Sequence, residues 1–565
     1  MLGINAPLPA VPYASGVRQD GDTVSFILNE PADTVTITRN FNDTFLVLNN
    51  VAAGEHTFDL AGVSDYTISV TNSAPAGWAE ISTSVGNPML NFERANGVAV
   101  NNNPGSPNFG RFYVSQRDGT VSQLGRQMGD GIYVFNADAT DAFGITDPND
   151  PSAARNAGLD FSGTPGSPFR ISVGPDDTLY IGDASDIHGG IYYTDPDVTT
   201  GGNLLAGLGG VQPIVERNHG SIISTPLISG SLAGGDLVLY TIDQDLPGSV
   251  PNTGSHVWRY DIGGTANYAG TPTLALDAST IGTNSDGSSI LTASNSRNYD
   301  AGYDLPPNFL ADITRDPRTG NFIIMQLNRG LLVMDPTLST ILFNSQQFYI
   351  DNEIESGIFR QSASAVVSPD GKYLFFRNYY LGGVFVATLD DDGLPILDAT
   401  QGSSLGLDYF TAPTPYSGTP RAPIIYDLAG NIYTAGNLAA SERLGIYSPG
   451  GDTVAVTRSN GTFTINGTTY GDHLEGDLNN DGFVGIIDLS IILGNWNEAV
   501  AHGVFTLGDP SGDGFVGIED LNVVLSNWNA GTPPGETANI PEPGGVFAVV
   551  SGLISLAGRR GRGYR

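Results

Sequence analysis

Two acidic loops near the carboxyl end contain the residues whose types and spacing could do chemistry. Both follow the pattern Asp-x-Asn/Ser-x-Asp-Gly-Phe-Val-Gly. Calcium takes about six to eight oxygen ligands from such a loop, with side chains at positions 1, 3, 5 and 12 and a backbone carbonyl at position 7. The predicted Ca²⁺ ligands are Asp477, Asn479, Asp481, Phe483 and Asp488 in the first loop, and Asp509, Ser511, Asp513, Phe515 and Asp520 in the second.

The remaining loop positions fit the same interpretation. Gly482 and Gly514 occupy position 6, where the chain must turn sharply. Position 9 is also glycine, so a water molecule is expected at that vertex. Ser511 is a weaker ligand than Asn479, and the second site is therefore expected to bind less tightly. A pair of metal-free turns is the alternative, but a pattern repeated in matching context favours calcium.

An apolar stretch with helical spacing follows each loop and ends in Asn-Trp-Asn. The spacing predicts two short helices in a module so small that bound metal would contribute to its folding. Residues 471–530 resemble a type I dockerin-like module, which implies Ca²⁺ as the cofactor and a cohesin-like partner. In that family the residues just before position 12 help to recognise the partner, often through hydroxyl groups. Here they are Ile486-Ile487 and Ile518-Glu519, which depart from that pattern.

The last residues form an ordered set of signals. Residues 531–543 read as a linker that contains Pro541-Glu542-Pro543. An uncharged run from Gly544 to Gly558 predicts a single hydrophobic helix, and a basic cluster that includes Arg559 and Arg560 completes residues 544–565. At ~1.5 Å per residue the run spans less than the ~30 Å hydrocarbon core of a bilayer.

This tail resembles the PEP-CTERM sorting signal of bacterial exosortase systems. The resemblance implies export, transient membrane insertion through the carboxyl-terminal helix, and cleavage near Glu542 by an exosortase-like enzyme. The mature protein would then be secreted or held at the bacterial cell surface. Met1 to Gly16 contains no basic segment and no sustained apolar one, so no export signal is visible there. The expectation is that the start has been trimmed or mis-called, or that the chain is a mature or fragmentary form.

Composition limits the function classes. The 565 residues are enough for three or four domains. The formal net charge of −35 argues against nucleic acid as a partner, since phosphates need a basic surface. The absence of cysteine excludes disulfides and cysteine catalysis. With 74 glycines, 35 prolines and 40% hydrophobic residues, the chain is expected to be mainly β and rich in turns.

After a leader or linker over residues 1–18, residues 19–85 alternate in the manner of strands and predict a small β-sandwich. The expected strands lie at Thr23 to Leu28, Asp33 to Thr38, Phe45 to Leu48 and Tyr66 to Val70. This segment resembles the FlgD-type immunoglobulin-like domain, with another small β-sandwich as the alternative.

Residues 86–470 contain a loosely recurring unit with an apolar strand, a Gly/Pro/Asp/Asn turn and further strands. A single unit cannot bury both of its faces, whereas radially packed units share a core. Six copies predict a six-bladed β-propeller, with seven blades possible, that resembles NHL-repeat and gluconolactonase-like propellers. A β-helix and two stacked sandwiches remain alternatives. The copies cover 97–115 with 131–136, 170–183 with 190–195, 225–243 with 257–261, 313–325 with 330–335, 365–376 with 383–387, and 424–436 with 445–447.

No catalytic constellation stands out in the propeller segment. His188 and His219 fall in predicted loops, and no two histidines have a metal-ligand spacing such as HExxH. Gly402 to Gly406 matches G-x-S-x-G, but without the strand and helix that this motif needs. Acidic runs at 147–150 and 390–392 are interpreted as solvated turns rather than calcium sites. Turn formation is also the expected role of Asp176, Asp183, Asp335 and Asp370.

Three functions follow from these patterns. The leading one is an exported surface or matrix protein whose propeller binds a surface polysaccharide or protein. The alternative is an extracellular carbohydrate-active, lactonase or lyase-type propeller enzyme with carboxylates at the propeller mouth. In the third, the dockerin-like module makes the chain part of a scaffold.

Overall fold

The computed structural model describes residues 11–529 with gaps. The gaps are residues 40–42, 63–65, 74–76, 82–86, 94, 118, 123, 163–166, 185–188, 207–221, 244–255, 279, 292–309, 327–328, 356, 379–382, 411–422, 437–442, 450–453, 460–461, 466–467, 472–475, 477, 479–483, 499, 501–507 and 509–514.

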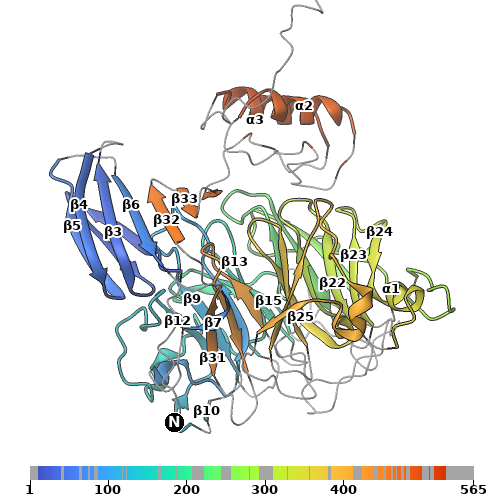
Figure 1. The fold of residues 1–565 in the computed structure, drawn as a ribbon, viewed down its shortest axis with the longest axis horizontal. Helices are drawn as coiled ribbons and strands as arrows, with labels where there is room; N and C mark the ends of the chain where they lie inside the picture. The colour runs from blue at the N-terminus through green and yellow to red at the C-terminus, as the bar shows by residue number, and fades with distance from the viewer. Residues whose placement is uncertain are drawn as a thin grey trace, which may run out of the picture.

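Strands dominate the described residues, so the mainly β fold expected from the sequence is confirmed (Figure 1). The α-helices there are short: α1 (Ser345–Asp351), α2 (Ile486–Gly494) and α3 (Ile518–Ser526). None of them is long and apolar enough to cross a bilayer. The predicted hydrophobic helix from Gly544 to Gly558 lies outside the described residues.

Six sheets make up the propeller-like body, one after another along the chain. A separate two-stranded hairpin of β10 (Thr120–Val121) and β11 (Gln127–Met128) precedes the last strand of the first sheet in the chain. The sheet strands are β8 (Ala95–Val100), β9 (Phe112–Gln116) and β12 (Gly131–Phe135); β13 (Ile171–Val173), β14 (Leu179–Asp183), β15 (Gly190–Thr194) and β16 (Gly201–Asn203); β17 (Leu227–Ser229), β18 (Leu237–Asp243), β19 (His256–Gly263) and β20 (Thr273–Leu276); β21 (Leu310–Arg315), β22 (Phe322–Gln326), β23 (Gly330–Met334) and β24 (Ile341–Asn344); β25 (Ser362–Val367), β26 (Tyr373–Asn378), β27 (Val384–Thr388) and β28 (Asp408–Phe410); and β29 (Ile424–Tyr426), β30 (Ile432–Ala435), β31 (Leu444–Ser448) and β7 (Ala79–Glu80).

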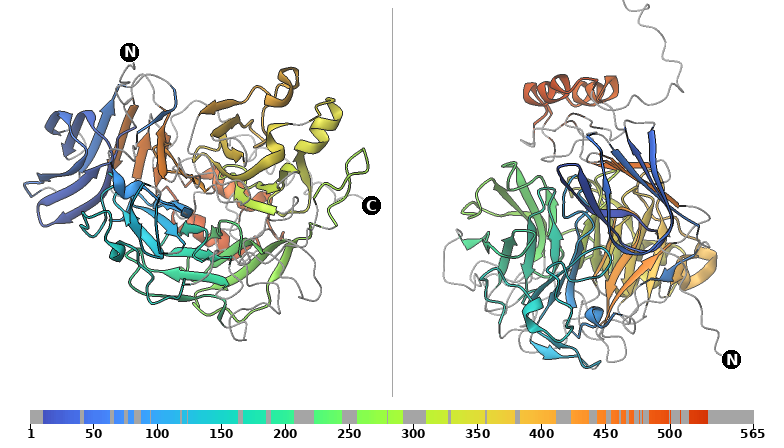
Figure 2. Two further views of the ribbon diagram at one scale, coloured as in Figure 1. Left: turned by 90° about the horizontal axis from the view of Figure 1, so that it is seen from below. Right: turned by 90° about the vertical axis from the view of Figure 1, so that its left-hand side faces the viewer.

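The sheets are arranged radially as blades, with the first strand of each nearest the axis (Figure 2). Neighbouring first strands contact one another from β17 through β21, β25 and β29 to β8 and β13. Between the second and third blades, Ser172 of β13 donates a hydrogen bond to the carbonyl of Pro226. The ring therefore closes, and the last blade lies beside the first.

The burial of the middle strands of the blades explains why a repeating unit can be recognised in the sequence. Every residue of β9, β14, β22 and β31 is buried because blades cover both faces of these strands. Buried strands of this kind read as apolar runs. The outer strands β16, β20, β24 and β28 are short and partly exposed, and the repeating unit in the sequence did not include them.

A separate β-sandwich uses both ends of the propeller segment. One sheet contains β1 (Ala14–Asp20), β2 (Thr23–Leu28) and β5 (Gly54–Asp59). The other has the order β34-β33-β32-β6-β3-β4, and apolar residues such as Phe26, Val35 and Ile68 fill the space between the sheets. Its strands are β3 (Ala32–Arg39), β4 (Asp43–Val51), β6 (Tyr66–Asn72), β32 (Val454–Ser459), β33 (Thr462–Ile465) and β34 (Thr468–Gly471).

Two strand pairings cross the domain ranges expected from the sequence. Strand β7, expected in the sandwich range 19–85, pairs with β31 and completes the last blade. Strands β32 to β34, expected in the propeller range 86–470, join the sandwich sheet through the pairing of β32 with β6. In addition, β1 begins within the expected leader 1–18. Local patterns cannot assign a strand to one of two sheets, because the hydrogen-bond partners are far away in sequence.

Polar contacts hold the turns of neighbouring blades together. Asp177, in the β13–β14 turn, accepts hydrogen bonds from the side-chain amides of Asn101 at 2.8 Å, Asn103 at 2.7 Å and Asn108 at 3.1 Å, all from the first blade. Asp177 has a φ of +65°, a conformation that Asp and Asn tolerate better than other non-glycine residues. One carboxylate thus fixes the β8–β9 loop onto the second blade.

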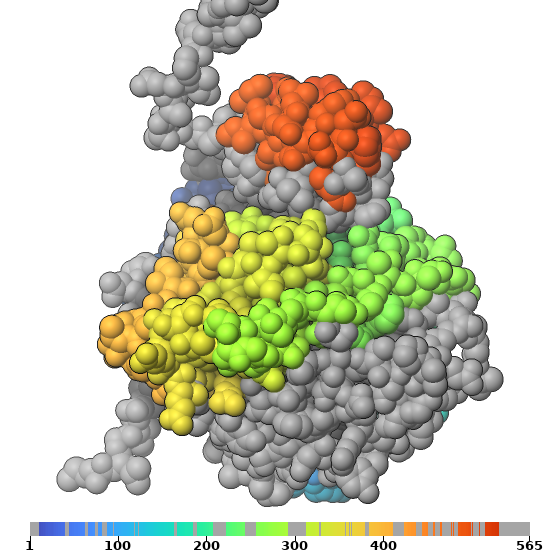
Figure 3. Space-filling model, turned by 90° about the vertical axis from the view of Figure 1, so that its right-hand side faces the viewer, coloured from blue at the N-terminus to red at the C-terminus, as the bar shows by residue number. Residues whose placement is uncertain are grey.

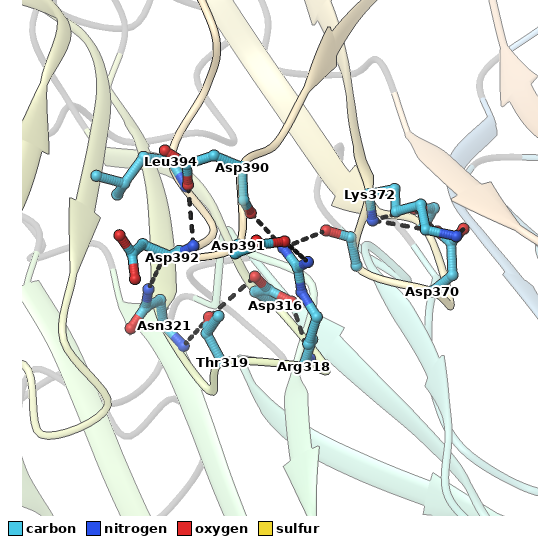
Figure 4. A network of polar contacts seen from close by, with 12 residues as sticks. Asp316, Arg318, Thr319, Asn321, Asp370, Lys372, Asp390, Asp391, Asp392 and Leu394 are labelled. Atoms are coloured by element: carbon cyan, nitrogen blue, oxygen red, sulfur yellow. Dashed lines mark hydrogen bonds and ion pairs between the residues drawn. The ribbon is translucent and has the colours of Figure 1, made fainter. Parts of the chain in front are cut away.

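A second network joins the fourth and fifth blades (Figure 4). Arg318 donates to the carbonyls of Gly371, at 3.2 Å, and Asp390. Asn321 donates to the carbonyl of Asp392 at 2.8 Å. The buried carboxylate of Asp316 lies so close to Gly371, which has a φ of +67°, that an added Cβ would be 2.8 Å from it. The acidic run 390–392 is therefore part of an interblade contact.

The junction between sandwich and propeller contains a buried carboxylate. Asp427, in the β29–β30 turn, accepts hydrogen bonds from the backbone of Asn431 at 2.9 Å and the hydroxyl of Tyr433 at 3.1 Å. Burial raises the pKa of Asp427 to about 6, although those hydrogen bonds act to lower it. Val11 and Tyr13 belong to the same buried apolar cluster as Ala429 of the β29–β30 turn, so the amino-terminal segment covers this turn.

The Asp177 contacts predict a measurable contribution to stability. In Asp177→Asn, an NH₂ group that cannot accept a hydrogen bond replaces one carboxylate oxygen, while asparagine tolerates the positive φ of this position as well as aspartate does. The free energy of unfolding should therefore fall by about 1 to 3 kcal/mol. Denaturant unfolding measures it. Asp391→Asn is the control, since the fully exposed Asp391 forms a surface ion pair with Arg318 at 3.4 Å, and exposed pairs of this kind contribute little to stability. Equal losses in the two variants would contradict a special role for Asp177.

The raised pKa of Asp427 predicts that the free energy of unfolding falls as the pH rises. Its folded-state pKa of about 6 lies above the ordinary value of 3.8, so between these values the native state binds more protons than the unfolded state. The resulting stabilisation is complete below pH about 4 and is lost as the pH rises through about 6. Asp427→Asn should therefore weaken the fall in unfolding free energy between pH 4.5 and 7, whereas Asp391→Asn, at an exposed carboxylate, should not. The same pH profile for Asp427→Asn and the wild type would contradict this.

Candidate functional site

The carboxyl-terminal module is the first candidate site, and the structure describes part of it. Helices α2 and α3 follow the two acidic loops at the positions that the apolar spacing predicted. Among the predicted ligands, Asp488, Phe515 and Asp520 are described. Those outside the described residues are Asp477, Asn479, Asp481, Phe483, Asp509, Ser511 and Asp513, and so are Pro541, Glu542, Pro543, Arg559 and Arg560 of the predicted sorting tail.

The carboxylates at position 12 are fully buried. The Asp488 carboxylate accepts hydrogen bonds from the backbone amides of Leu478 and Gly485, both at 2.7 Å. Asp520 accepts one from Gly517 at 2.7 Å. Each aspartate lies in the first turn of its helix, where negative charge interacts favourably with the helix dipole. The aspartates thereby hold the end of each loop against the helix that follows.

The two loop–helix units pack reciprocally. The backbone amide of Asn497, after α2, donates to the carbonyl of Val516 at 2.9 Å, and that of Asn529, after α3, donates to Val484 at 2.9 Å. Gly508 lies against α2, where an added Cβ would be 3.3 Å from the carbonyl oxygen of Ile491. Gly476 lies equally close to α3. Each unit thus completes the packing of the other around a small core that includes Ile492 and Val524.

The described part of the module fits calcium in its donor chemistry. Calcium prefers carboxylate and carbonyl oxygens, and burying a carboxylate without a compensating charge is costly. Buried aspartates occur in both units at the position where the loop pattern requires a carboxylate ligand. Within the described residues alone, no three Asp, Glu or His side chains form a metal-binding group, so the ligand set depends on the other loop positions in the sequence.

The module exposes several large apolar side chains. Ile486 and Ile487 are 58% and 50% exposed, and Ile518 is 61% exposed. These residues precede position 12 of the loops, so the pairs that depart from the dockerin pattern lie at the surface. Figure 3 shows the module projecting from the propeller body. Leu493, Trp496, Leu525 and Trp528 add further exposed apolar side chains.

Three of the acidic residues expected to form turns, Asp176, Asp335 and Asp370, accept hydrogen bonds within their turns. Asp335 accepts backbone hydrogen bonds from Ser339 at 2.7 Å and Thr340 at 3.0 Å. Asp176 accepts one from Thr178 at 3.2 Å. The prediction is wrong for Asp183, which is the last residue of β14 and whose buried carboxylate accepts a hydrogen bond from Ser167. The G-x-S-x-G match begins in a 3₁₀ helix (Ala399–Ser404) rather than in a strand. His188 and His219 lie outside the described residues.

A second candidate site, which the sequence analysis missed, is a groove of about 1000 Å³ between the fifth and sixth blades. Trp78 leads into β7, and its ring stacks on Phe410 of β28 with centroids 4.5 Å apart and 14° between the planes. Ile465 of β33 and Tyr426 of β29 also line the groove. The lining comes from well-separated regions of the sequence between Gly77 and Ile465, and its aromatic residues have no common spacing. No motif could therefore have revealed it.

Comparisons with known proteins assign no family. No protein-family model matches the sequence, and no curated protein sequence matches it. Solved structures similar to the fold include a gluconolactonase from Xanthomonas campestris (12% identity, 76% of this chain and 98% of that chain, TM-score 0.35). Others are a DUF4623 family protein from Bacteroides eggerthii (10%, 76% and 89%, 0.38) and PorZ, a surface component of the type-IX secretion system of Porphyromonas gingivalis (12%, 76% and 74%, 0.30). These similarities do not extend to function.

The buried position-12 aspartates predict the calcium stoichiometry of the full chain. Asp488→Ala and Asp520→Ala should each remove or strongly weaken one calcium-binding event and lower the helical signal of the module, because each removes both a predicted ligand and a hydrogen bond to the loop backbone. Calorimetric calcium titration and far-ultraviolet circular dichroism, with and without chelator, measure these effects. Glu519→Ala is the matched control, because Glu519 is exposed and is not a predicted ligand. Unchanged titrations in both aspartate variants would contradict the assignment.

Proposed function

We propose that this chain is an exported binding protein of the bacterial cell surface, in which a propeller-like body carries the binding site. A calcium-stabilised, dockerin-like module follows the body, and a PEP-CTERM-like tail directs sorting. The supporting observation is the pair of buried aspartates, Asp488 and Asp520, in two reciprocally packed units. Calcium is abundant outside cells, so a module that depends on it suits an exported protein.

Calcium would act on the folding of the module rather than on a reaction. The apolar core around Ile492 and Val524 is small, and domains of such size usually need a metal or other crosslink. When bound, the ion would neutralise the loop carboxylates, which otherwise repel one another. Asp488 and Asp520 would then link the metal to the first turns of α2 and α3, coupling metal binding to helix position.

The exposed isoleucines supply a docking surface on the module. Ile486, Ile487 and Ile518 present aliphatic side chains, whereas Glu519 places a charge in the second copy. A partner at this face would need a complementary apolar patch, so a cohesin-like partner that reads hydroxyl groups fits poorly. A protein partner with an apolar patch fits the isoleucines better.

The body suits binding because its blades are locked together. The hydrogen bonds to Asp177 and the contacts of Arg318 join neighbouring blades through their turns. A rigid scaffold keeps surface groups in place, which reduces the entropy lost on binding. Transient membrane insertion and cleavage near Glu542 by an exosortase-like enzyme would leave this body secreted or attached at the surface.

Processing of the tail tests the proposed sorting. In a bacterium with an exosortase system, the tagged full chain should lose its carboxyl-terminal segment and appear at the surface. Glu542→Ala should remain uncleaved in the membrane fraction, since the motif would no longer be recognised. Mass spectrometry of the terminus and surface protease accessibility measure the two outcomes. Glu536→Ala, in the same linker, is the matched control, and normal processing of Glu542→Ala would contradict the proposal.

A further inference from the structure

The groove between the fifth and sixth blades contains one aromatic ring held in place by its neighbours and two others that are partly exposed. Trp78 is held by its stack on Phe410 and an edge contact with Phe375, whose centroid is 5.4 Å away. Tyr373 and Tyr409 are 42% and 48% exposed, so much of their surface is open to a ligand. Aromatic side chains with two χ angles lose little entropy on binding. The groove therefore offers apolar ring faces in set positions.

Polar groups lie among these rings. Asp370 accepts a hydrogen bond from the hydroxyl of Ser368 at 2.6 Å, and its carboxylate is 3.2 Å from the ammonium of Lys372. Burial alone would raise the pKa of Asp370, but hydrogen bonds from Ser368 and Lys372 lower it on balance, so it stays ionised at neutral pH. Asp408 is exposed on β28 next to Tyr409. The lining therefore holds charged acceptors beside aromatic surface.

The negative charge of the groove lining disfavours anionic ligands. The lining contains two carboxylates, Asp370 and Asp408, against one ammonium, Lys372, which is already paired. Phosphates, nucleotides and uronic-acid polymers would meet like charge there, and the net charge of −35 adds to the repulsion. An acyl chain would displace water from Asp408 and from the outer side of Asp370 and offer these carboxylates no hydrogen bond in return. A suitable ligand is uncharged, with apolar faces and many hydroxyl donors.

We propose that this groove, lined by Trp78, Tyr373 and Tyr409, binds a segment of a neutral polysaccharide. The apolar faces of sugar rings would lie on the exposed tyrosines, and sugar hydroxyls would donate hydrogen bonds to Asp370 and Asp408. A volume of about 1000 Å³ is at the upper end of the range for ligand pockets and leaves room for several sugar units. The inference rests on the proposed role as a surface binding protein and names the class of its ligand.

Binding of the purified full chain to defined glycans tests the groove. The probes are an array of neutral oligosaccharides, including β-1,3- and β-1,4-glucan, xylan and mannan fragments, with polygalacturonate and alginate fragments as anionic probes. The wild type should bind at least one neutral glycan. Tyr373→Ala and Tyr409→Ala should each weaken that binding roughly fivefold to tenfold, because each removes a stacking surface. Asp408→Asn should weaken it less, since an amide oxygen still accepts a hydrogen bond.

Controls keep the result specific to the groove. Phe45→Ala, at a partly exposed ring on β4 far from the groove in sequence, should leave glycan binding unchanged. Thermal unfolding of every variant separates lost stacking on the glycan from lost folding, because Tyr373 and Tyr409 also contact the rings of Phe375 and Phe385. Glycan binding is therefore compared at a temperature at which every variant is fully folded. Failure of the neutral glycans to bind, equal or tighter binding of the anionic fragments, or unchanged affinity in both tyrosine variants would overturn the inference.

The sorting experiment remains independent of this outcome. A chain that is cleaved and surface-exposed but binds no neutral glycan would retain the proposed surface location and lose the carbohydrate ligand. A chain that binds glycan through Tyr373 and Tyr409 but is not processed at Glu542 would retain the groove and lose the sorting pathway.

Discussion

Closure of the ring of blades is the constraint on which the rest of the molecule depends. The last blade is completed by β7, whose residues Ala79 and Glu80 pair with Ser448 and Tyr447 of β31. A strand that precedes the first blade is thus hydrogen-bonded to the last one. Glu80 also forms an ion pair with Arg443. Opening the ring would break these contacts and expose the buried faces of two blades.

The same closure organises the sandwich and the groove. The chain enters the propeller from β6 and leaves it into β32, and these two strands pair with each other. Both ends of the propeller segment are therefore joined in one sheet. Trp78 stands just before β7, and Ile465 lies on β33, so the groove that they line exists only where the closed ring meets the sandwich. The buried Asp427 lies at this junction and links its stability to pH.

The carboxyl-terminal module and the propeller are stabilised in different ways. Blades are stabilised by apolar strands buried on both faces, together with polar contacts between turns such as those of Asp177 and Asp316. The carboxyl-terminal module has a small core, and its buried aspartates interact mainly with backbone amides. The contacts of the module join residues within one short segment of the sequence. Closure of the propeller instead requires contacts between residues that are several hundred positions apart.

The sequence alone determined the local elements. Alternation located β2, β3, β4 and β6 to within a few residues, and apolar runs located the three inner strands of each blade, because burial imposes these patterns on neighbouring residues. Helical spacing located α2 and α3 in the same way. Only the tertiary structure decided that β7 belongs to the last blade, that β32 to β34 belong to the sandwich, and that Trp78, Tyr373 and Tyr409 line one groove. Those outcomes depend on hydrogen bonds and side-chain contacts between segments that are far apart in the sequence. Such contacts do not produce a regular spacing of residue types, so a local pattern cannot predict them.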